Sequence, residues 1–244
     1  MLVQIQHPER LIYPESDGKP MGENTLQVKW IVAILNGLEG VFRDRPDVFL
    51  AADLFWYPQY ADPTNVTAPD VMVVFGRPKV DRPSYKQWEE ENIPPQVVFE
   101  IQSPGNTADE LAGKFRFYRR HQVEEYYLYD PATHQLQAWV RSVRKLVPVK
   151  EINGFVSPRL KVRFEVSESE PMKLIRPDGT RFRTYLELLS DAEEAQRQAA
   201  AERKQAESER KRAESQRKRA DTAVRRADAL AAKLRELGVD PDAL

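Results

Sequence analysis

The stretch that decides the fold runs from Pro95 to Pro131 and reads PQVVFEIQSPGNTADELAGKFRFYRRHQVEEYYLYDP. It begins with an apolar run, Gln96 to Ile101, which lies between two prolines and a Ser-Pro-Gly turn and therefore predicts a buried strand. A helical segment over residues 107–121 and a second apolar strand over residues 124–130 follow. This order predicts an α/β fold in which a mixed central sheet is flanked by helices.

Glu100 is the unusual residue of the first strand, because a buried carboxylate is costly to desolvate unless it is paired or binds a metal. Side chains alternate along a strand, so Glu100 and Gln102 share one face. Upstream, Asp70 stands at the entrance of another apolar strand, residues 71–75. If the two strands pair, Asp70 and Glu100 converge beside Gln102, and such an all-oxygen group suits a hard divalent cation.

These residues resemble the PD-(D/E)xK signature of restriction-type nucleases, with Asp70 and Glu100 as its acids. The surrounding segments resemble the Uma family of bacterial restriction endonucleases over nearly all of residues 10–190; they are LFWYP, APDVMVVFGRPK, YKQWEE, VVFEIQSPGN, KFRFY, VEEYYLYDP and RPDGTRF. The resemblance implies a restriction-endonuclease-like fold and hydrolysis of DNA phosphodiester bonds with Mg²⁺ or Mn²⁺. It assigns the metal to Asp70, Glu100 and the carbonyl of Ile101.

The chain departs from the signature at Gln102, where the superfamily has a lysine that orients water and offsets phosphate charge. Gln102 can bind water or metal but supplies no charge. Lys114 resembles the family's helical lysine and is the candidate replacement, and an ion pair with Glu110 four residues earlier is its ordinary alternative. The catalytic set is therefore Asp70, Glu100, Gln102 and Lys114. The alternative function is a catalytically impaired nuclease fold that binds DNA or assembles with other proteins through its tail.

Two further acids are auxiliary candidates. Glu23 begins a predicted helix that ends at residue 42, and it either caps this helix or leans toward the site as a third acid. Asp53 lies in a predicted strand over residues 47–60, which allows for a bulge or bend, and it is either an edge or turn carboxylate or an auxiliary ligand of metal or water. The basic and aromatic side chains of the long loop 76–95 either clamp DNA or pack as a lid on the core.

The second half of the first domain predicts short strands at residues 136–140, 145–151 and 160–164 and a hairpin around the Pro-Asp-Gly turn at 177–179. Glu125, in the strand 124–130, is either a solvent-side residue or a partner of the site.

Composition limits the class of protein. The 244 residues are long enough for one large core with an appendage. A formal net charge of −1 gives no overall attraction to nucleic acid or anionic membranes, so any DNA affinity must come from a local patch. The absence of cysteine excludes disulfides and thiol chemistry. No apolar run approaches the ~18 residues of a membrane span, so we expect a cytoplasmic protein without a membrane partner.

The tail is a separate charged segment. Ala-Glu or Ala-Asp pairs recur every seven residues at 206, 213, 220 and 227, and ten bases and five acids lie between 202 and 226. Along the helix face that this repeat defines, the side chains are apolar only over residues 220–237. This pattern predicts a solvated helix with a short coiled-coil segment at its end, and a possible homodimer or higher homo-oligomer. Contact of this segment with DNA stays open as an alternative. The expected domains are a nuclease domain, 1–190, and a helical or coiled-coil segment, 191–244.

Overall fold

The computed structural model describes residues 12–15 and 25–236, and the structural statements below concern these residues. The chain divides into two units, residues 1–185 and 186–244, and each is described by itself. Over the described ranges, no helix is both long and apolar enough to cross a membrane.

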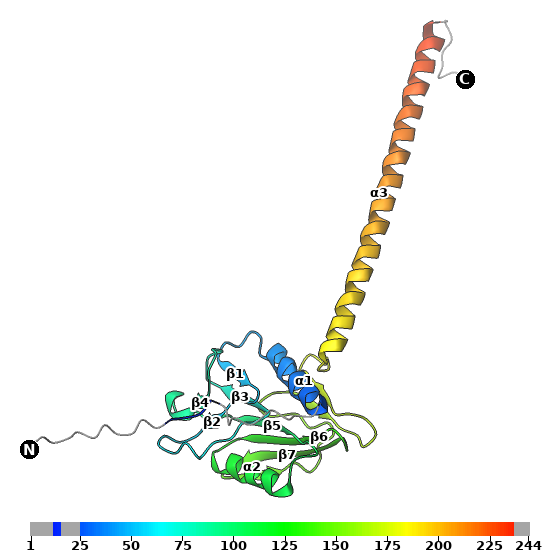
Figure 1. Ribbon diagram of the computed structural model, residues 1–244. Coiled ribbons are helices and arrows are strands. Elements are labelled where there is room, and N and C mark those ends of the chain that lie inside the picture. Colours follow the sequence, from blue (N-terminus) through cyan, green and yellow to red (C-terminus); the bar gives the residue numbers. More distant parts are fainter. Residues whose placement is uncertain (1–11, 16–24, 237–244) are drawn as a thin grey trace, which may run out of the picture. The chain divides into compact units, whose positions relative to one another are not determined.

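The first unit is built around a six-stranded mixed sheet with the strand order β1-β3-β5-β6-β7-β8 (Figure 1). Its strands are β1 (Val48–Ala51), β3 (Val71–Phe75), β5 (Val97–Ile101), β6 (Glu125–Asp130), β7 (Gln135–Ser142) and β8 (Lys145–Pro148). β5 and β6 pair in parallel and the other neighbours are antiparallel. A parallel pair needs a long crossover, and helix α2 (Ala108–Arg120) supplies it.

Two small sheets complete the first unit. β2 (Trp56–Tyr57) pairs in parallel with β4 (Tyr85–Lys86), which the short 3-10 helix η1 (Gln87–Glu89) follows. β9 (Arg163–Glu165) pairs antiparallel with β10 (Lys173–Ile175).

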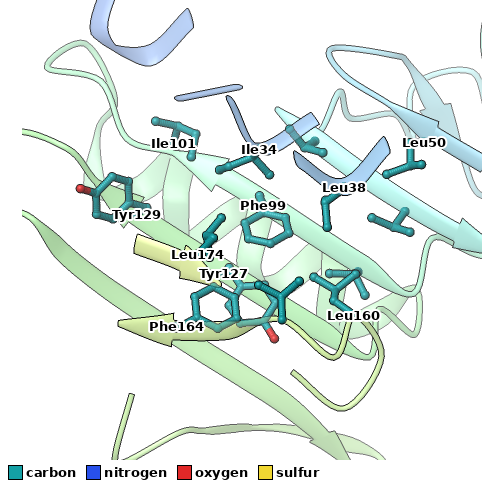
Figure 2. Packing of buried hydrophobic residues seen from close by; sticks show 14 of the residues in the cluster. Ile34, Leu38, Leu50, Phe99, Ile101, Tyr127, Tyr129, Leu160, Phe164 and Leu174 are labelled. Atoms are coloured by element: carbon teal, nitrogen blue, oxygen red, sulfur yellow. The ribbon is translucent and has the colours of Figure 1, made fainter. Parts of the chain in front are cut away.

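Helices cover both faces of the central sheet (Figure 1). α1 (Thr25–Val41) packs Ile34 and Leu38 onto the face that carries Phe99 and Tyr127 (Figure 2). The opposite face carries Val98 and packs against α2. Each large side chain buried in this way contributes on the order of 2 kcal/mol, so the alternation of β5 between two covered faces fixes its register.

The predicted α/β class, with a mixed sheet flanked by helices, is confirmed. Residues 47–60 do not form one strand: β1 ends at Ala51, and Asp53 has a φ of 48°, so the chain bends before β2. The turn at 177–179 forms, with the amide of Gly179 donating to the carbonyl of Arg176. The two arms of the predicted hairpin are joined by an antiparallel bridge between Ile175 and Arg181, and β10 also pairs with β9 on its other side.

One helix, α3 (Tyr185–Glu236), is 52 residues long. All of it except its first residue belongs to the second unit. Its side chains are exposed from residue 190 to residue 230. Ion pairs with the predicted four-residue spacing form between Glu207 and Lys211, at 2.6 Å, and between Glu214 and Lys218, at 2.9 Å.

Candidate active site

The register of β3 and β5 brings two buried acids together. Val71 pairs with Phe99, so Asp70, just before β3, stands opposite Glu100. Oδ2 of Asp70 accepts a hydrogen bond of 2.6 Å from the amide of Ile101. Asp70 is 8% exposed and Glu100 is 3% exposed. Each carboxylate therefore depends on protein groups for its solvation.

Helix α2 aims two side chains at Glu100. The helix begins at a capping box, in which the Thr107 hydroxyl accepts from the Glu110 amide and the Glu110 carboxylate accepts from the Thr107 amide. Residues four apart lie on one helix face, and Lys114 and Tyr118 share the face toward β5. Nζ of Lys114 donates to Oε2 of Glu100 at 2.6 Å, and the hydroxyl of Tyr118 donates to Oε1.

The ion pair with Glu100 decides the position of Lys114. The Glu110 carboxylate, the alternative partner, serves in the capping box instead. The Lys114 side chain is 31% exposed whereas that of Glu100 is 4% exposed. Lys114 thus reaches from the buried acid toward the surface.

Two contributors to the site carry no mark in the sequence. Tyr118 is fully buried, and its ring stacks on that of Trp56 with centroids 6.4 Å apart. Its spacing of four residues from Lys114 is the signal that could have identified it. Gln27, buried on α1, hydrogen-bonds to Asp70. It lies four residues after Glu23, on the helix from which a third acid was expected.

Burial dominates the electrostatics of the site. Desolvation raises the pKa of Glu100 to about 7, against the attraction of Lys114 and with the repulsion of Asp70. Desolvation also raises the pKa of Asp70, although Lys114 and the Ile101 amide oppose it. For Lys114, desolvation lowers the pKa, but the two carboxylates outweigh it and the pKa is raised. When both acids are ionised, one lysine leaves them with an excess of negative charge.

The other predicted residues lie around this centre. The amide of Gln102 donates to the carbonyl of Tyr129 at 2.8 Å, while its half-buried side chain has no hydrogen-bond partner among the described residues. Asp53 is exposed in the bend after β1 and lies near enough to raise the pKa of both Asp70 and Lys114. Glu23 lies outside the described residues.

The loop 76–95 holds its arginines in internal ion pairs. Nε of Arg77 lies 2.8 Å from Glu90, and Nε of Arg82 lies 2.7 Å from the same carboxylate. The aromatic side chain of Trp88 packs against Tyr13 and Tyr60, with ring centroids 4.9 and 5.6 Å apart. This arrangement favours the packed lid over a clamp of free cations.

Both sequence interpretations of Glu125 are wrong. Its side chain is 1% exposed. Glu125 pairs with Val97, which lies three residues before Glu100, so the side chains of Glu125 and Glu100 point to opposite faces of the sheet. It accepts hydrogen bonds from the Tyr127 hydroxyl at 2.8 Å, the Ser157 hydroxyl and the Arg159 amide at 2.6 Å. Glu125 therefore ties residues 157–159 to the sheet.

The donor set fits a hard divalent cation of the kind that the resemblance implies. Among residues 12–15 and 25–236, no group of three or more His, Cys, Asp or Glu could hold a metal. Mg²⁺, however, is commonly bound by one or two carboxylates with waters and substrate phosphates, which matches Asp70 and Glu100. A carboxylate offers about four lone-pair directions, so the bonds to Ile101, Lys114 and Tyr118 leave acceptor capacity.

The comparison with family models agrees with the resemblance. The model of the Uma2 family, described as "Putative restriction endonuclease", matches residues 12–170. A crystal structure of a protein from Anabaena variabilis, described as a "putative nuclease belonging to DUF820", aligns with a TM-score of 0.43 and 15% identity over 57% of this chain and 75% of that one. A search among curated proteins found no match.

Proposed function

This chain belongs to the Uma2 restriction-endonuclease family, and on that premise we propose that it is an endonuclease that hydrolyses DNA phosphodiester bonds with a divalent cation. The observation that carries the proposal is the pair of buried carboxylates, Asp70 and Glu100, with Lys114 bound to one of them. An excess of buried negative charge is stable only when something compensates it, and a bound cation can do so in place of the protons that the raised pKa values of the two acids favour.

Asp70, Glu100 and the Ile101 carbonyl are the proposed holders of Mg²⁺ or Mn²⁺. The amide and carbonyl of a strand residue point toward the same neighbour, so the carbonyl of Ile101 faces the side on which its amide meets Asp70. When bound, the cation supplies a Lewis acid that lowers the barrier to attack of water on a phosphodiester.

Lys114 and Gln102 are the proposed groups for substrate and water. An ammonium group has three donors, and Lys114 uses one on Glu100, so the others are available to phosphate oxygens as negative charge develops. The Gln102 amide can donate to phosphate or accept from water, but it carries no charge. Lys114 thereby replaces, from a helix, the cation that the signature places two residues after the second acid.

Tyr118 is the proposed positioning residue. Its hydroxyl binds Oε1 of Glu100 while Lys114 binds Oε2. Two donors on two oxygens fix the plane of the carboxylate, and a fixed ligand binds its cation without first being ordered. Asp53, exposed beside the site, is the proposed auxiliary acid.

A second function is favoured by one observation. The side chain at the signature's lysine position is a neutral amide, Gln102, without a hydrogen-bond partner in the described part of the chain. The second function is a nuclease fold that has lost catalysis and that binds DNA or assembles through α3. Such a protein would not require a positively charged side chain at position 102.

Nicking of supercoiled plasmid DNA by the purified chain tests the proposal. We expect activity with Mg²⁺ or Mn²⁺, none with a chelator, and a fall of at least about 100-fold in Glu100→Gln. Asp178→Asn is the control, because Asp178 is an exposed turn residue bonded to Thr180. Nicking that persists in Glu100→Gln would contradict the assignment. A wild-type chain that binds DNA and cation but never nicks would support the second function.

A further inference from the structure

Helix α3 carries a line of three exposed arginines, none of which forms an ion pair in the described part of the chain. Arg212, Arg219 and Arg226 are spaced by seven residues, close to two helical turns, so they lie nearly in line. All three are exposed. We call them the basic stripe.

The helix itself does not balance the basic stripe. Within the described residues none of the three has an ion pair, whereas Lys211 and Lys218 beside them are paired with Glu207 and Glu214. Neighbours on a helix face are three and four residues away. For Arg219 and Arg226 these neighbours are all uncharged; they are Ser215, Gln216, Thr222, Ala223, Ala229 and Leu230. Arg212 has one acid among its neighbours, Glu209.

A second line of arginines in the same helix differs in this respect. Arg203, Arg210 and Arg217 also repeat every seven residues and are exposed. Each has an acid four residues later, and these acids are Glu207, Glu214 and Asp221. These acids lie close enough to offset part of the field of the second line, although Glu207 and Glu214 also form ion pairs with Lys211 and Lys218. We call the second line the balanced line.

We propose that the basic stripe binds the phosphate backbone of duplex DNA without regard to sequence. The choice of DNA rests on the proposed function, and the stripe adds to it a second contact with the substrate, outside the catalytic unit. Such a contact holds the enzyme on DNA whatever bases lie beneath it.

The chemistry of the stripe favours a nucleic acid over an acidic protein helix. The positions between its arginines are small and mostly polar, Ser215 and Thr222 among them. The large apolar neighbour, Leu230, lies only beyond the last arginine, so a protein partner would find little apolar surface to bury. Exposed ion pairs alone contribute little to the binding of an acidic helix. Duplex DNA offers one charge per about 1.7 Å and releases counterions when it is neutralised. Serine and threonine hydroxyls add hydrogen bonds to phosphate.

A second copy of the chain is a poorer partner. The alanines at 206, 213, 220 and 227 form the seam along which two such helices could pair. The basic stripe and the balanced line flank this seam on its two sides, so pairing brings arginine against arginine. Like charges facing each other across a coiled coil oppose association.

The test is binding of the full-length chain to a labelled duplex of arbitrary sequence, by fluorescence anisotropy in chelator so that no cleavage occurs. One variant replaces the basic stripe (Arg212→Gln, Arg219→Gln, Arg226→Gln). The matched control replaces the balanced line (Arg203→Gln, Arg210→Gln, Arg217→Gln). Both remove the same charge, and glutamine has nearly the helix propensity of arginine.

We expect the stripe variant to lose at least about tenfold in affinity at low salt, and the slope of log Kd against log salt to fall by about 2–3, since each phosphate contact contributes about 0.9. In the control, the change in log Kd and the change in the salt slope should each be less than half of those in the stripe variant. The single variants Arg219→Gln and Arg217→Gln give the same comparison if a triple variant loses helix.

Equal losses in the two triple variants would overturn the proposal, because they would show an effect of overall charge. Unchanged binding in the stripe variant would overturn it as well. If the variant kept its DNA binding but lost binding to polyglutamate, the partner would be an acidic protein. Because the assay contains no divalent cation, a chain that never nicks DNA can still pass it, and an active nuclease can still fail it.

Discussion

At the residue scale, the chemistry of this molecule centres on how Glu100 is held. Lys114 and Tyr118, one helical turn apart on α2, each donate to a different oxygen of that carboxylate. Hydrogen bonds to charged groups contribute about 1.5–3 kcal/mol, and a buried acceptor left without its donor costs a similar amount. The same two contacts therefore stabilise the fold and orient the proposed ligand.

Tyr118→Phe tests the contact with Glu100. Removing the hydroxyl should destabilise the chain by about 1–3 kcal/mol and weaken Mn²⁺ binding, because Glu100 loses a donor and its orientation. Tyr126→Phe is the control: Tyr126 lies buried on the same face of the sheet, and its hydroxyl has no partner among the described residues. Urea unfolding of both variants decides, and equal losses of stability would contradict the role of Tyr118.

Gln102→Lys tests whether the missing cation limits activity. Lysine at this position restores the charge of the signature, so nicking should increase or at least persist. A loss as complete as that of Glu100→Gln would show that the amide of Gln102 makes a required contact. It would also weaken the replacement role of Lys114.

Glu125→Gln tests a carboxylate outside the site. Burial raises the pKa of Glu125 above 4.5, although Ser157, Tyr127 and the Arg159 amide oppose the rise. A raised folded pKa contributes stability that is present below pH 4.5 and is lost as the pH rises through the folded pKa. The free energy of unfolding of the wild-type chain should therefore fall by up to about 1.4 kcal/mol per pH unit over this range. In the variant this dependence on pH should be absent. Urea unfolding at about pH 5 and about pH 8 measures it.

Glu124→Gln is the control for Glu125→Gln. Glu124 is the half-exposed neighbour that pairs with Arg159, and its replacement removes the same formal charge. A pH slope that stays unchanged in Glu125→Gln, or that flattens equally in both variants, would contradict the account of Glu125.

The sequence marks only those site residues whose type is unusual for their place. Asp70 and Glu100 are conspicuous because acids interrupt apolar runs, and the register of β3 with β5 then sets them opposite each other. Tyr118 and Gln27 are ordinary residues of amphipathic helices, and only the tertiary fold shows where they reach. Glu125 was misassigned because both faces of β6 are covered. Successive side chains of β6 therefore point alternately into two buried clusters, and neither face is open to solvent.

At the element scale, α1 depends on a glycine for its packing. A Cβ at Gly37 would clash with the ring of Phe182, whereas one at Gly40 would meet only the guanidinium end of Arg176. The ring can move only at the expense of the core, and a flexible arginine can simply move away.

Gly37→Ala should therefore cost about 1–3 kcal/mol from overpacking, despite the gain of about 1 kcal/mol in helix propensity. Gly40→Ala, in the last turn of the same helix, should be nearly neutral or slightly stabilising. Thermal unfolding of the two variants makes the comparison. A Gly37→Ala chain as stable as Gly40→Ala would show that α1 does not approach Phe182 so closely.

Long periodic elements could be predicted, and short ones could not. α2 has a capping box at its start and basic residues in its last turn, so the local sequence is enough to identify both of its ends. β2 and β4 have two residues each, and they pair in parallel across a separation of 29 positions. Contacts of that range leave no local pattern, and the loop 76–95 was for the same reason not resolved into its strand, 3-10 turn and ion pairs.

At the scale of the whole molecule, we propose that residues 1–190 fold and bind the cation without the tail. None of the proposed ligands lies beyond residue 190, and α3 exposes its side chains from residue 190 to residue 230. The cytoplasmic location and the homo-oligomer expected from the sequence stay predictions.

Removal of residues 192–244 should leave a cooperative melt and unchanged Mn²⁺ binding, since an alanine-rich seam buries little apolar area. Any self-association should be weak, and it should fall on truncation if α3 pairs between chains. Sedimentation and thermal melts of the full and truncated chains measure both. A truncated chain that aggregates or melts without cooperativity would contradict the boundary.

Calorimetric titration of Mn²⁺ tests the central claim, that Asp70 and Glu100 form a divalent-cation site, most directly. The wild-type chain and the Asp178→Asn control should bind the cation, and Asp70→Asn should bind it at least about tenfold more weakly. Asparagine keeps an oxygen for the Ile101 amide, so the fold should survive. Equal Mn²⁺ affinity in Asp70→Asn and the wild type would contradict the site.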